Sequence, residues 1–517
     1  MSGPVERGGG ERLDSTRLAD LWRKLEKDSS YEHASVIIPS LSFDAEELAK
    51  ISGVAFYEER LLFLLMRLRN PAARALYVTS HPIPEEILEY YLDLLAGVPG
   101  THARRRLKLL CVHDVRPVPL TEKILERPRT IARIRSWIGN PKRAYLTCFN
   151  STALERSLAQ ALDIPLNGVD PDLLHLGTKS GSRRVFRRAG TCLPDGFEEV
   201  FGTDELIERI AELGTLPPPT RKAAVKLNSS FSGQGNAVFT YPEARSDKAA
   251  LAACLADAKL TSTSETVESF CAKLALNGGI VERFIEADEV RSPSVQMRIT
   301  PTGEIQVVST HEQVLGGETG QAYEGCRFPA LDDYRALLQQ RGIEIAEVLR
   351  SEGVVSRFAV DFLAWRSAAD PTWQLAAIEV NLRMGGTTFP FLALEFLTNG
   401  RLDEGGNFLS QRGTPKYYVA TDAMKSPNYR GLLPEDLLEI AIEERLIFDP
   451  DPQTGVLFHM IGALSQYGKL GVIAIGDSRE QAQTYFEDTR RVLNEATGTR
   501  RKPGPATATP DVVHRMD

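Results

Sequence analysis

Two segments in the second half of the chain alternate apolar residues with polar or charged ones. Residues 357–364 place Asp361 between two apolar neighbours, and residues 376–383 carry Glu379, Asn381 and Arg383 at every other position. This alternation predicts two half-buried strands, because side chains two residues apart on a strand point to the same face. A carboxylate buried without a cation is costly, so we expect both strands to face a cleft that holds positive charge.

The oxygen atoms of Asp361, Glu379 and Asn381 suit magnesium, a hard cation that takes carboxylates and amide oxygens and shares nucleotide phosphates. Arg383 lies on the same predicted face, where its guanidinium can clamp a phosphate or acyl-phosphate oxygen. The pattern therefore predicts that Asp361, Glu379 and Asn381 bind Mg²⁺, with ATP bound beside the ion. A structural salt bridge is the alternative interpretation of the two carboxylates.

A glycine- and serine-rich hairpin lies upstream of these strands. Residues 223–227 are typical of a buried strand that carries Lys226, and residues 237–240 of the strand that returns. The tip is predicted to offer backbone N–H and hydroxyl donors to phosphates from Ser230, Ser232, Gly233 and Gly235. No Gly-Lys-Ser/Thr sequence follows, so this is not a Walker loop. A plain turn is the alternative.

Several blocks in this order resemble the ATP-grasp superfamily. They are similar above all to the peptide ligases of pheganomycin biosynthesis and to the glutamyl:carrier-protein ligase of butirosin biosynthesis. The blocks are residues 177–183, the Lys226 hairpin, residues 292–296, residues 310–317, residues 376–388 and a tail around His459. The resemblance implies an α/β chain with an ATP-grasp fold, made of a lid and a central subdomain. A Rossmann-like domain would precede it and a small α/β domain would follow it.

The resemblance also implies the roles of further residues. Lys179 and Lys226 would contact the phosphates of ATP, and Glu289 would bind the ribose. The segment that would contact the adenine contains Glu282, Phe284 and Ile285. The alternatives are a solvated surface lysine for Lys179 and ordinary exposed glutamates at strand ends for Glu282 and Glu289. Two Mg²⁺ ions are expected, with Mn²⁺ as a substitute.

The substrate side of the site is predicted from a second group of residues. Gly385, Gly386, Thr387 and Thr388 offer a nest of N–H groups and hydroxyls for the substrate carboxylate, with a plain loop as the alternative. Arg298 and Arg357 are further candidates for a catalytic role. His311, placed in a glycine-terminated loop, would orient an acceptor or cap the turn, and we favour the turn. Met384 and Phe389 stand where relatives often carry lysine and histidine, which suggests a more apolar acid substrate.

The activity implied is an ATP-dependent carboxylate–amine ligase of specialised metabolism, which forms an acyl phosphate and releases ADP and phosphate. Its partners would be a carboxylic or amino acid and an amine or peptide nucleophile, with a homodimer expected by analogy. The alternatives are acyl transfer to a carrier-protein thiol, a small-molecule kinase and a non-enzymatic scaffold. Intact Lys226, Asp361, Glu379 and Asn381 argue against the scaffold.

Composition narrows the class of protein. No run reaches the roughly 18 apolar residues of a membrane span, and the first 13 residues are too polar for a signal peptide. The net charge of −8 gives no footprint for nucleic acid, and the six cysteines have no metal-site spacing. We therefore expect a cytoplasmic protein without nucleic-acid, membrane or zinc partners.

The order of elements predicts the domains. Strands at 34–39, 75–79, 107–112 and 144–149 alternate with helices at about 55–68, 84–96, 120–138 and 151–162, which predicts a parallel sheet covered on both faces. No Gly-x-Gly-x-x-Gly fingerprint is present, so this sheet should not hold a dinucleotide. The expected divisions are 1–12 disordered, 13–170 Rossmann-like, 171–220 connecting helices, 221–288 lid, 289–400 central subdomain, 401–495 small α/β domain and 496–517 disordered.

Overall fold

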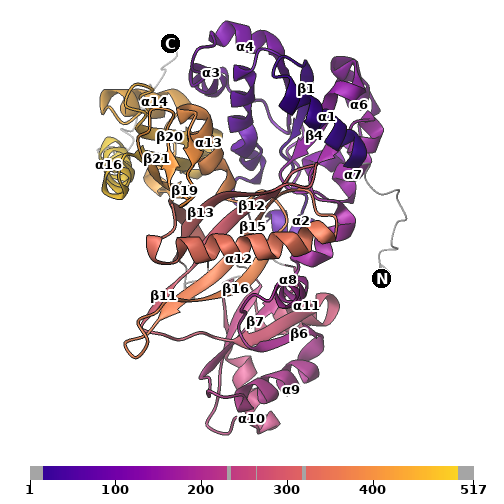
Figure 1. The fold of residues 1–517 in the computed structure, drawn as a ribbon, viewed down its shortest axis with the longest axis vertical. Coiled ribbons are helices and arrows are strands. Elements are labelled where there is room, and N and C mark those ends of the chain that lie inside the picture. Colours follow the sequence, from indigo (N-terminus) through magenta and orange to yellow (C-terminus); the bar gives the residue numbers. More distant parts are fainter. Residues whose placement is uncertain (1–14, 50, 230–234, 263–264, 317–321, 499–517) are drawn as a thin grey trace, which may run out of the picture.

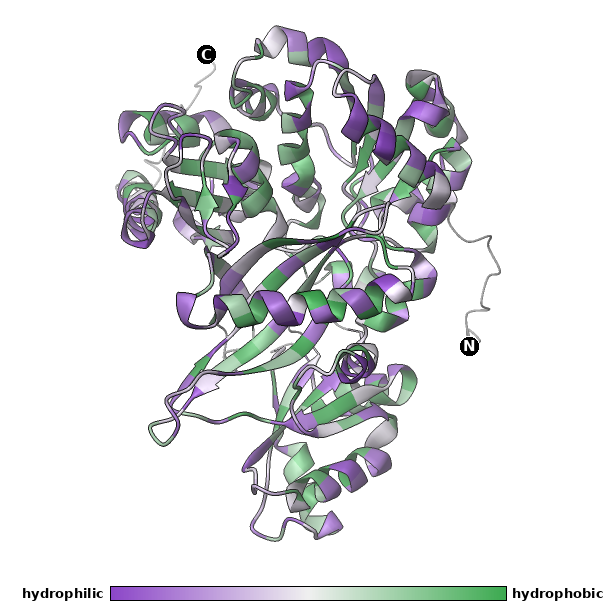
Figure 2. Cartoon of the chain, in the orientation of Figure 1, coloured by the Kyte–Doolittle hydropathy of each residue, from purple (hydrophilic) through white to green (hydrophobic). Residues whose placement is uncertain are grey.

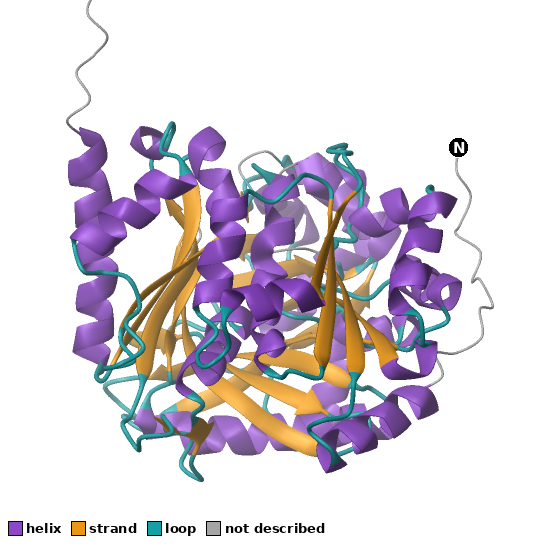
Figure 3. Cartoon of the chain, turned by 90° about the horizontal axis from the view of Figure 1, so that it is seen from above, coloured by secondary structure: helices purple, strands orange, loops and turns teal. Residues whose placement is uncertain are grey.

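The computed structural model describes residues 15–49, 51–229, 235–262, 265–316 and 322–498. Three large sheets organise this part of the chain, with the lid sheet at the bottom of Figure 1 and the central sheet across its middle. The N-terminal and C-terminal parts lie side by side above the central sheet. Viewed from above, the strands form the interior and helices surround them (Figure 3). None of the helices described is long and apolar enough to cross a membrane.

The N-terminal sheet has five parallel strands in the order β3-β2-β1-β4-β5. These strands are β1 (His33–Ile38), β2 (Ala73–Thr79), β3 (Leu107–Cys111), β4 (Ala144–Cys148) and β5 (Leu166–Asn167). The helical elements are α1 (Ser15–Lys27), α2 (Ala45–Ala49), η1 (Val54–Arg69), α3 (Glu85–Asp93), α4 (Gly100–Arg106), α5 (Leu120–Leu125), α6 (Pro128–Ile138), η2 (Pro141–Arg143) and α7 (Ala153–Leu162). The predicted Rossmann-like sheet is confirmed, because nearly continuous apolar strands bury both faces.

Two of the predicted helices differ in detail. The segment expected as one helix over 120–138 is two helices, because Pro128 has no N–H to donate and holds Arg127 outside the helical region, at φ −121°. The segment expected at 55–68 is the 3₁₀ helix η1. Glu58 and Glu59 are buried there beside the apolar run 61–66, so tertiary contacts decide its conformation.

The lid sheet has five strands in the order β6-β10-β7-β8-β9. They are β6 (Gly196–Val200), β7 (Lys222–Leu227), β8 (Asn236–Thr240), β9 (Lys259–Leu260) and β10 (Gly279–Arg283). Helices α9 (Gly202–Thr215), α10 (Lys248–Ala256) and α11 (Val267–Asn277) accompany it, preceded by η3 (Pro171–Gly177) and α8 (Lys179–Arg188). Strand β6 lies in the segment expected to hold only connecting helices, and it pairs antiparallel with β10. The lid sheet therefore begins before residue 221.

The central sheet has nine strands in the order β11-β15-β12-β13-β14-β19-β21-β20, with β16 pairing β15. They are β11 (Glu289–Arg291), β12 (Pro293–Ile299), β13 (Ile305–Gly316), β14 (Ala322–Phe328), β15 (Ser356–Arg366), β16 (Gln374–Asn381), β19 (Tyr417–Lys425), β20 (Gly455–His459) and β21 (Lys469–Gly476). Helix α12 (Asp332–Ser351) covers one face, and an added Cβ at Gly342 would meet Val295 and Met297 of β12. Figure 2 shows hydrophilic and hydrophobic residues alternating along α12.

The C-terminal segment continues the central sheet, because β14 pairs with β19. The remaining elements are α13 (Thr388–Thr398), β17 (Arg401–Leu402), β18 (Phe408–Leu409), η4 (Pro427–Tyr429), α14 (Pro434–Glu443), η5 (Ile461–Ala463), α15 (Leu464–Tyr467) and α16 (Arg479–Gly498). The division expected at residue 401 therefore does not separate two sheets. The strand–helix–strand order predicted between residues 456 and 475 is present.

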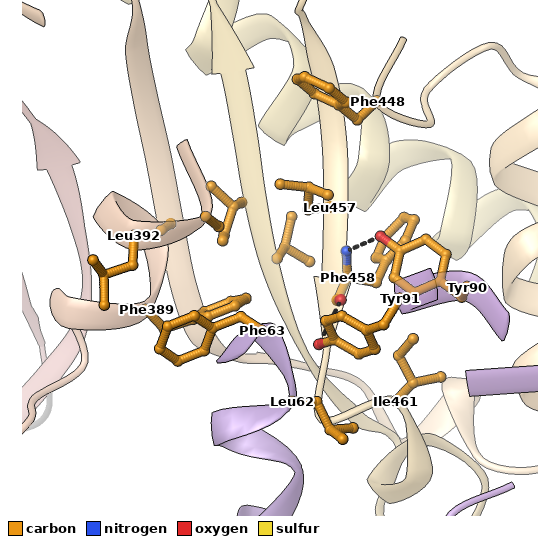
Figure 4. Close-up of a cluster of buried hydrophobic side chains, with 14 of the residues drawn as sticks. Leu62, Phe63, Tyr90, Tyr91, Phe389, Leu392, Phe448, Leu457, Phe458 and Ile461 are labelled. Atoms are coloured by element: carbon orange, nitrogen blue, oxygen red, sulfur yellow. Dashed lines mark hydrogen bonds between the residues drawn. The ribbon is translucent and has the colours of Figure 1, made fainter. Parts of the chain in front are cut away.

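One hydrophobic core joins the first and last parts of the chain. It includes Phe63 of η1, Tyr91 of α3, Phe389 of α13 and Phe458 of β20. Figure 4 shows these side chains together, with the hydroxyl groups of Tyr90 and Tyr91 bonded to the backbone of Phe458. The N-terminal domain and the C-terminal strands thus share one hydrophobic core, to which α13 contributes.

Candidate nucleotide and metal site

The two carboxylates predicted as metal ligands lie directly opposite each other. Asp361 of β15 is the cross-strand partner of Glu379 on β16, and Ala359 is the partner of Asn381. Asn381 Nδ2 donates a hydrogen bond to Asp361 Oδ2 at 2.9 Å, and Gln313 Nε2 donates to Asp361 Oδ1 at 2.7 Å. The structure therefore brings the three predicted ligands together and adds Gln313, whose place on β13 no local sequence signal revealed.

Electrostatics at this pair favour a bound cation. Burial and the neighbouring Glu379 raise the pKa of Asp361 to about 7. Burial alone would raise the pKa of Glu379, but the positive charges of Lys179, Arg383 and Lys226 together outweigh burial, and the pKa is lowered. Within the described residues no group of three or more His, Cys, Asp or Glu gathers as a metal site. The donors are thus two carboxylates and one amide, which suits Mg²⁺ because it keeps several water or phosphate ligands.

Lys179 is not the surface lysine of the alternative interpretation. It begins helix α8, is 6% exposed, and its ammonium forms an ion pair with Glu379. Thr178 caps this helix by accepting a hydrogen bond from the Gly181 N–H at 3.0 Å. The helix N-terminus and the lysine together place positive charge beside the carboxylate pair.

Lys226 and Glu282 face each other across strands β7 and β10. Lys226 Nζ lies 2.6 Å from Glu282 Oε1, and Arg183 of α8 lies 3.0 Å from Glu282 Oε2. Glu282 is 3% exposed, so it is a buried carboxylate between two cations rather than an exposed strand end. Lys226 also lowers the pKa of Glu379, by less than Lys179 and Arg383 do. Lys226 therefore lies near the Asp361–Glu379 pair.

The hairpin tip and the predicted nucleoside contacts are described only in part. Ser230, Ser232 and Gly233 lie outside the described residues. Gly235 is described, with φ +83°, and its carbonyl accepts a hydrogen bond from the Leu227 N–H at 2.9 Å. Glycine adopts this left-handed backbone conformation more readily than other residues do.

Beyond β10 the chain continues toward the predicted ribose contact. The N–H of Phe284 bonds to the carbonyl of Lys222 at 3.2 Å, and Ile285 follows it, half-buried. Glu289 of β11 pairs with Arg291 and Arg366, each at 2.6 Å. These two ion pairs give Glu289 a structural role, and its contact with ribose stays a prediction.

The four residues predicted to bind the substrate carboxylate lie in the turn that leads into a helix and at its first residue. Helix α13 begins at Thr388, and the Gly385 N–H donates to Thr388 Oγ1 at 3.0 Å. Gln296 of β12 donates to Thr387 Oγ1. An added Cβ at Gly386 would lie 2.8 Å from the Tyr323 ring. The N-terminus of a helix attracts anions, which agrees with the predicted chemistry.

The prediction of a loop at His311 is wrong. His311 lies in strand β13, is fully buried, and its Nε2 lies 2.6 Å from the hydroxyl of Tyr418. Burial lowers its pKa to about 3, so the ring is neutral. The side chain packs against Phe328 and Tyr418.

The two arginines predicted to have catalytic roles lie together, but away from Asp361 and Glu379. Arg298 of β12 and Arg357 of β15 are cross-strand partners, four residues along β15 from Asp361. Arg383 does lie near Asp361 and Glu379. Burial lowers the pKa of Arg383, and the negative charges of Glu379 and Asp361 oppose this effect.

Met384 and Phe389 differ in what they contact. Met384 lines a small cleft with Arg357 and Arg383, and its N–H bonds to the Phe149 carbonyl at 3.2 Å. Phe389 is 4% exposed and its ring lies 4.9 Å from that of Phe63 and 4.3 Å from that of His459. Phe389 is therefore a core residue, and its identity says nothing about how apolar the substrate is.

Comparisons with known proteins agree with this geometry. Residues 249–405 match a family described as "IQCH-like, ATP-grasp", and residues 436–489 match one described as "PGM1 C-terminal domain". The chain is 28% identical over 474 residues to L-propargylglycine–L-glutamate ligase of Streptantibioticus cattleyicolor, covering 89% of this chain and 93% of the relative. It is 22% identical to IQ motif-containing protein H of Danio rerio, covering 75% of this chain and 40% of that protein.

Solved structures share the fold at low sequence identity. A biotin carboxylase from Campylobacter jejuni in complex with βγ-ATP superposes with a TM-score of 0.56 at 12% identity, covering 91% of this chain and 96% of the other. The biotin carboxylase domain of Hydrogenobacter thermophilus 2-oxoglutarate carboxylase, with MgADP, ADP and bicarbonate, gives 0.52 at 12% identity, covering 88% and 89%. Residues 249–405 thus match an ATP-grasp family, and this segment contains the facing carboxylates Asp361 and Glu379.

Proposed function

We propose that this chain is an ATP-dependent carboxylate–amine ligase that works through an acyl phosphate and releases ADP and phosphate. The observation that supports it best is the Asp361–Glu379 pair, flanked by Lys179 and opening toward Arg383. The similarity to L-propargylglycine–L-glutamate ligase over most of both chains favours amino acids as the acid and the amine. Peptide natural-product biosynthesis is the setting that we propose.

The residues present fit a magnesium ion. Asp361, Glu379 and Asn381 would hold it, and Gln313 would orient Asp361 through its hydrogen bond. When bound, the ion neutralises the charge of the nucleotide phosphates. A second ion and substitution by Mn²⁺ belong to the proposal, as does a cytoplasmic location. One of the similar structures holds MgADP and is a domain dimer, and we include a homodimer in the proposal.

The chain's own groups have separate tasks in this scheme. Lys179 and Lys226 would exchange their carboxylate partners for phosphate oxygens when ATP binds, and Gly235 would help to position the hairpin over them. The N-terminus of α13 would bind the substrate carboxylate beside Arg383. Phosphoryl transfer depends on positioning and charge stabilisation, so no nucleophilic side chain is required.

The reaction balances in two steps. A carboxylate oxygen of the acid attacks the γ-phosphorus of ATP, and ADP leaves. The neutral amine then attacks the acyl carbon, loses a proton, and phosphate leaves. A thiol in place of the amine would give the carrier-protein thioester that is the alternative acceptor chemistry.

The test is product analysis with purified protein, ATP, Mg²⁺ and pairs of amino acids. We expect ADP and phosphate in equal amounts, released only when both an acid and an amine are present. Hydroxylamine should trap the acyl phosphate as a hydroxamate. Release of AMP would contradict the proposal, and ADP without any hydroxamate would indicate a small-molecule kinase. Intact mass of a carrier protein incubated with ATP and an amino acid tests the thioester alternative.

A further inference from the structure

A second polar group lies on the face of the central sheet that carries Asp361. Arg298 and Arg357 are cross-strand partners there, and Arg67 at the end of η1 approaches them from the N-terminal domain. Arg298 and Arg67 both lower the pKa of Arg357, after burial, which brings it to about 9. Three guanidinium groups therefore converge between the N-terminal sheet and the central sheet.

Within the part of the chain that the structure describes, no carboxylate forms an ion pair with any of these three guanidinium groups. Among the described residues Arg357 makes no hydrogen bond or ion pair, and its buried Nη1 has no partner. Arg298 lies over the ring of Trp22 at 4.3 Å. Arg67 donates hydrogen bonds to the hydroxyl groups of Ser35, Tyr145 and Thr147, at 3.3–3.5 Å, and lies over the Tyr145 ring. An unpaired buried guanidinium is costly, so the arrangement indicates an anion that binds from outside the chain.

Two nearby carboxylates do not compensate for the three positive charges. Glu395 of α13 has its pKa raised by burial, opposed by Arg357 and Arg298, yet it forms no ion pair with a described residue. Glu26, which acts on Arg298 from farther away, accepts a hydrogen bond from Trp22 Nε1 at 2.6 Å. The group keeps an excess of positive charge.

The group connects with the predicted reaction centre. Ala359 lies between Asp361 and Arg357 on the same face and is buried, with about 13 Å separating the outer two Cα atoms. Gln296, the partner of Ala359, is held by its bond to Thr387. Arg357 also lines the cleft that contains Arg383 and Met384. An anion held by Arg357 in this cleft would therefore also lie beside Arg383, on whose pKa Glu379 and Asp361 act.

We propose that Arg298, Arg357 and Arg67 bind a carboxylate of the substrate other than the one that is activated, so that the enzyme takes a dicarboxylic amino acid. The proposal rests on the ligase function proposed above. Arginine is suited to this task because its planar group binds a carboxylate through two parallel hydrogen bonds.

The first experiment compares matched acids by ADP release. Wild-type protein should prefer glutamate to glutamine, or aspartate to asparagine, with a suitable amine present. Arg357→Gln and Arg298→Gln should each raise the KM for the dicarboxylic acid on the order of 30-fold or more and abolish the preference over the amide. The KM for ATP should stay within about twofold, and Arg357→Lys should lose less than Arg357→Gln. Arg209→Gln, in an exposed ion pair of α9, is the matched control and should behave as wild type.

A second experiment separates this inference from the proposed function. Calorimetry with glutarate, in the presence of ADP and Mg²⁺, should detect binding that Arg357→Gln and Arg298→Gln each weaken and Arg209→Gln does not. Glutarate binding of this kind without any ligation would overturn the ligase function and keep the anion site. Ligation of neutral acids, with no preference for dicarboxylates and no glutarate binding, would overturn the anion site and keep the ligase. Binding of inorganic phosphate in place of glutarate at the same arginines would also contradict the carboxylate proposal. Thermal melting of each variant shows whether it is folded.

Discussion

At the scale of single residues, alternation in the sequence was enough to predict the carboxylate pair. Asp361, Glu379 and Asn381 stand at positions where the pleat of a strand places them on one face. The same reasoning could not find the arginine group, because Arg298 and Arg357 meet only through the register of β12 against β15. It also could not place Gln313 or the burial of His311, which depend on neighbours that are distant in sequence.

Glu59 in η1 gives a prediction about pH and stability. Burial raises its pKa from an ordinary 4.5 to about 8, while its Oε2 accepts a hydrogen bond from the Gly462 N–H at 3.0 Å. The folded state therefore holds a proton that the unfolded state has released, and the free energy of unfolding falls as pH rises from about 5 to 8. The limiting slope for one group is about 1.4 kcal/mol per pH unit.

The variant Glu59→Gln should flatten this slope, because glutamine keeps the acceptor oxygen and does not ionise. Glu58 also contributes below pH 7, since its own pKa is about 7, so the range from pH 7 to 8 is the informative one. Urea unfolding at several pH values measures the effect. An unchanged slope between pH 7 and 8 would mean that Glu59 is already ionised in the fold.

At the scale of elements, type was easier to predict than extent. The strands of the N-terminal sheet were found because each is a short apolar run, and the return of the hairpin was found from its glycines. Strand β6 was missed because its sequence, Gly-Phe-Glu-Glu-Val, carries two adjacent glutamates, and pairing with β10 decides its conformation. Pro128 is the sequence signal for the break between α5 and α6, because proline disfavours a helical conformation of the residue before it.

The start of α13 offers a matched pair of substitutions. Gly386→Ala would place a Cβ 2.8 Å from the Tyr323 ring, whereas Gly385→Ala meets nothing within 4 Å. We expect Gly386→Ala to lower the free energy of unfolding by about 1–3 kcal/mol and to lower kcat/KM for the acid, because α13 must shift. Gly385→Ala should leave stability within about 0.5 kcal/mol. Chemical unfolding and steady-state kinetics of both variants check this, and equal behaviour would show that the helix start is not tightly packed.

At the scale of the whole molecule, the N-terminal domain and the C-terminal segment depend on each other for stability. The core behind α13 joins η1 and α3 to β20 and β21, so the N-terminal domain and the C-terminal segment should unfold together (Figure 4). Element order predicted the N-terminal parallel sheet, and the resemblance to ATP-grasp enzymes implied the lid and central subdomains. They could not show that β19, β20 and β21 extend the central sheet, because non-local strand pairing is not written in local sequence.

Tyr90 tests this joint core. Its hydroxyl accepts a hydrogen bond from the Phe458 N–H at 2.9 Å, so Tyr90→Phe leaves a buried backbone donor without a partner. We expect a loss of about 1–3 kcal/mol in the free energy of unfolding, with a single transition. Fluorescence and circular dichroism unfolding curves should coincide. Two separate transitions would contradict the view that both chain ends share one folding unit.

The central claim is that Asp361 and Glu379 bind magnesium against the phosphates of a nucleotide. Calorimetric titration of ADP with and without Mg²⁺ tests it directly, in wild type and in Glu379→Gln. We predict that Mg²⁺ tightens ADP binding by wild type, and that Glu379→Gln keeps its fold but loses at least about tenfold of this effect. An equal magnesium effect in both proteins would contradict the account.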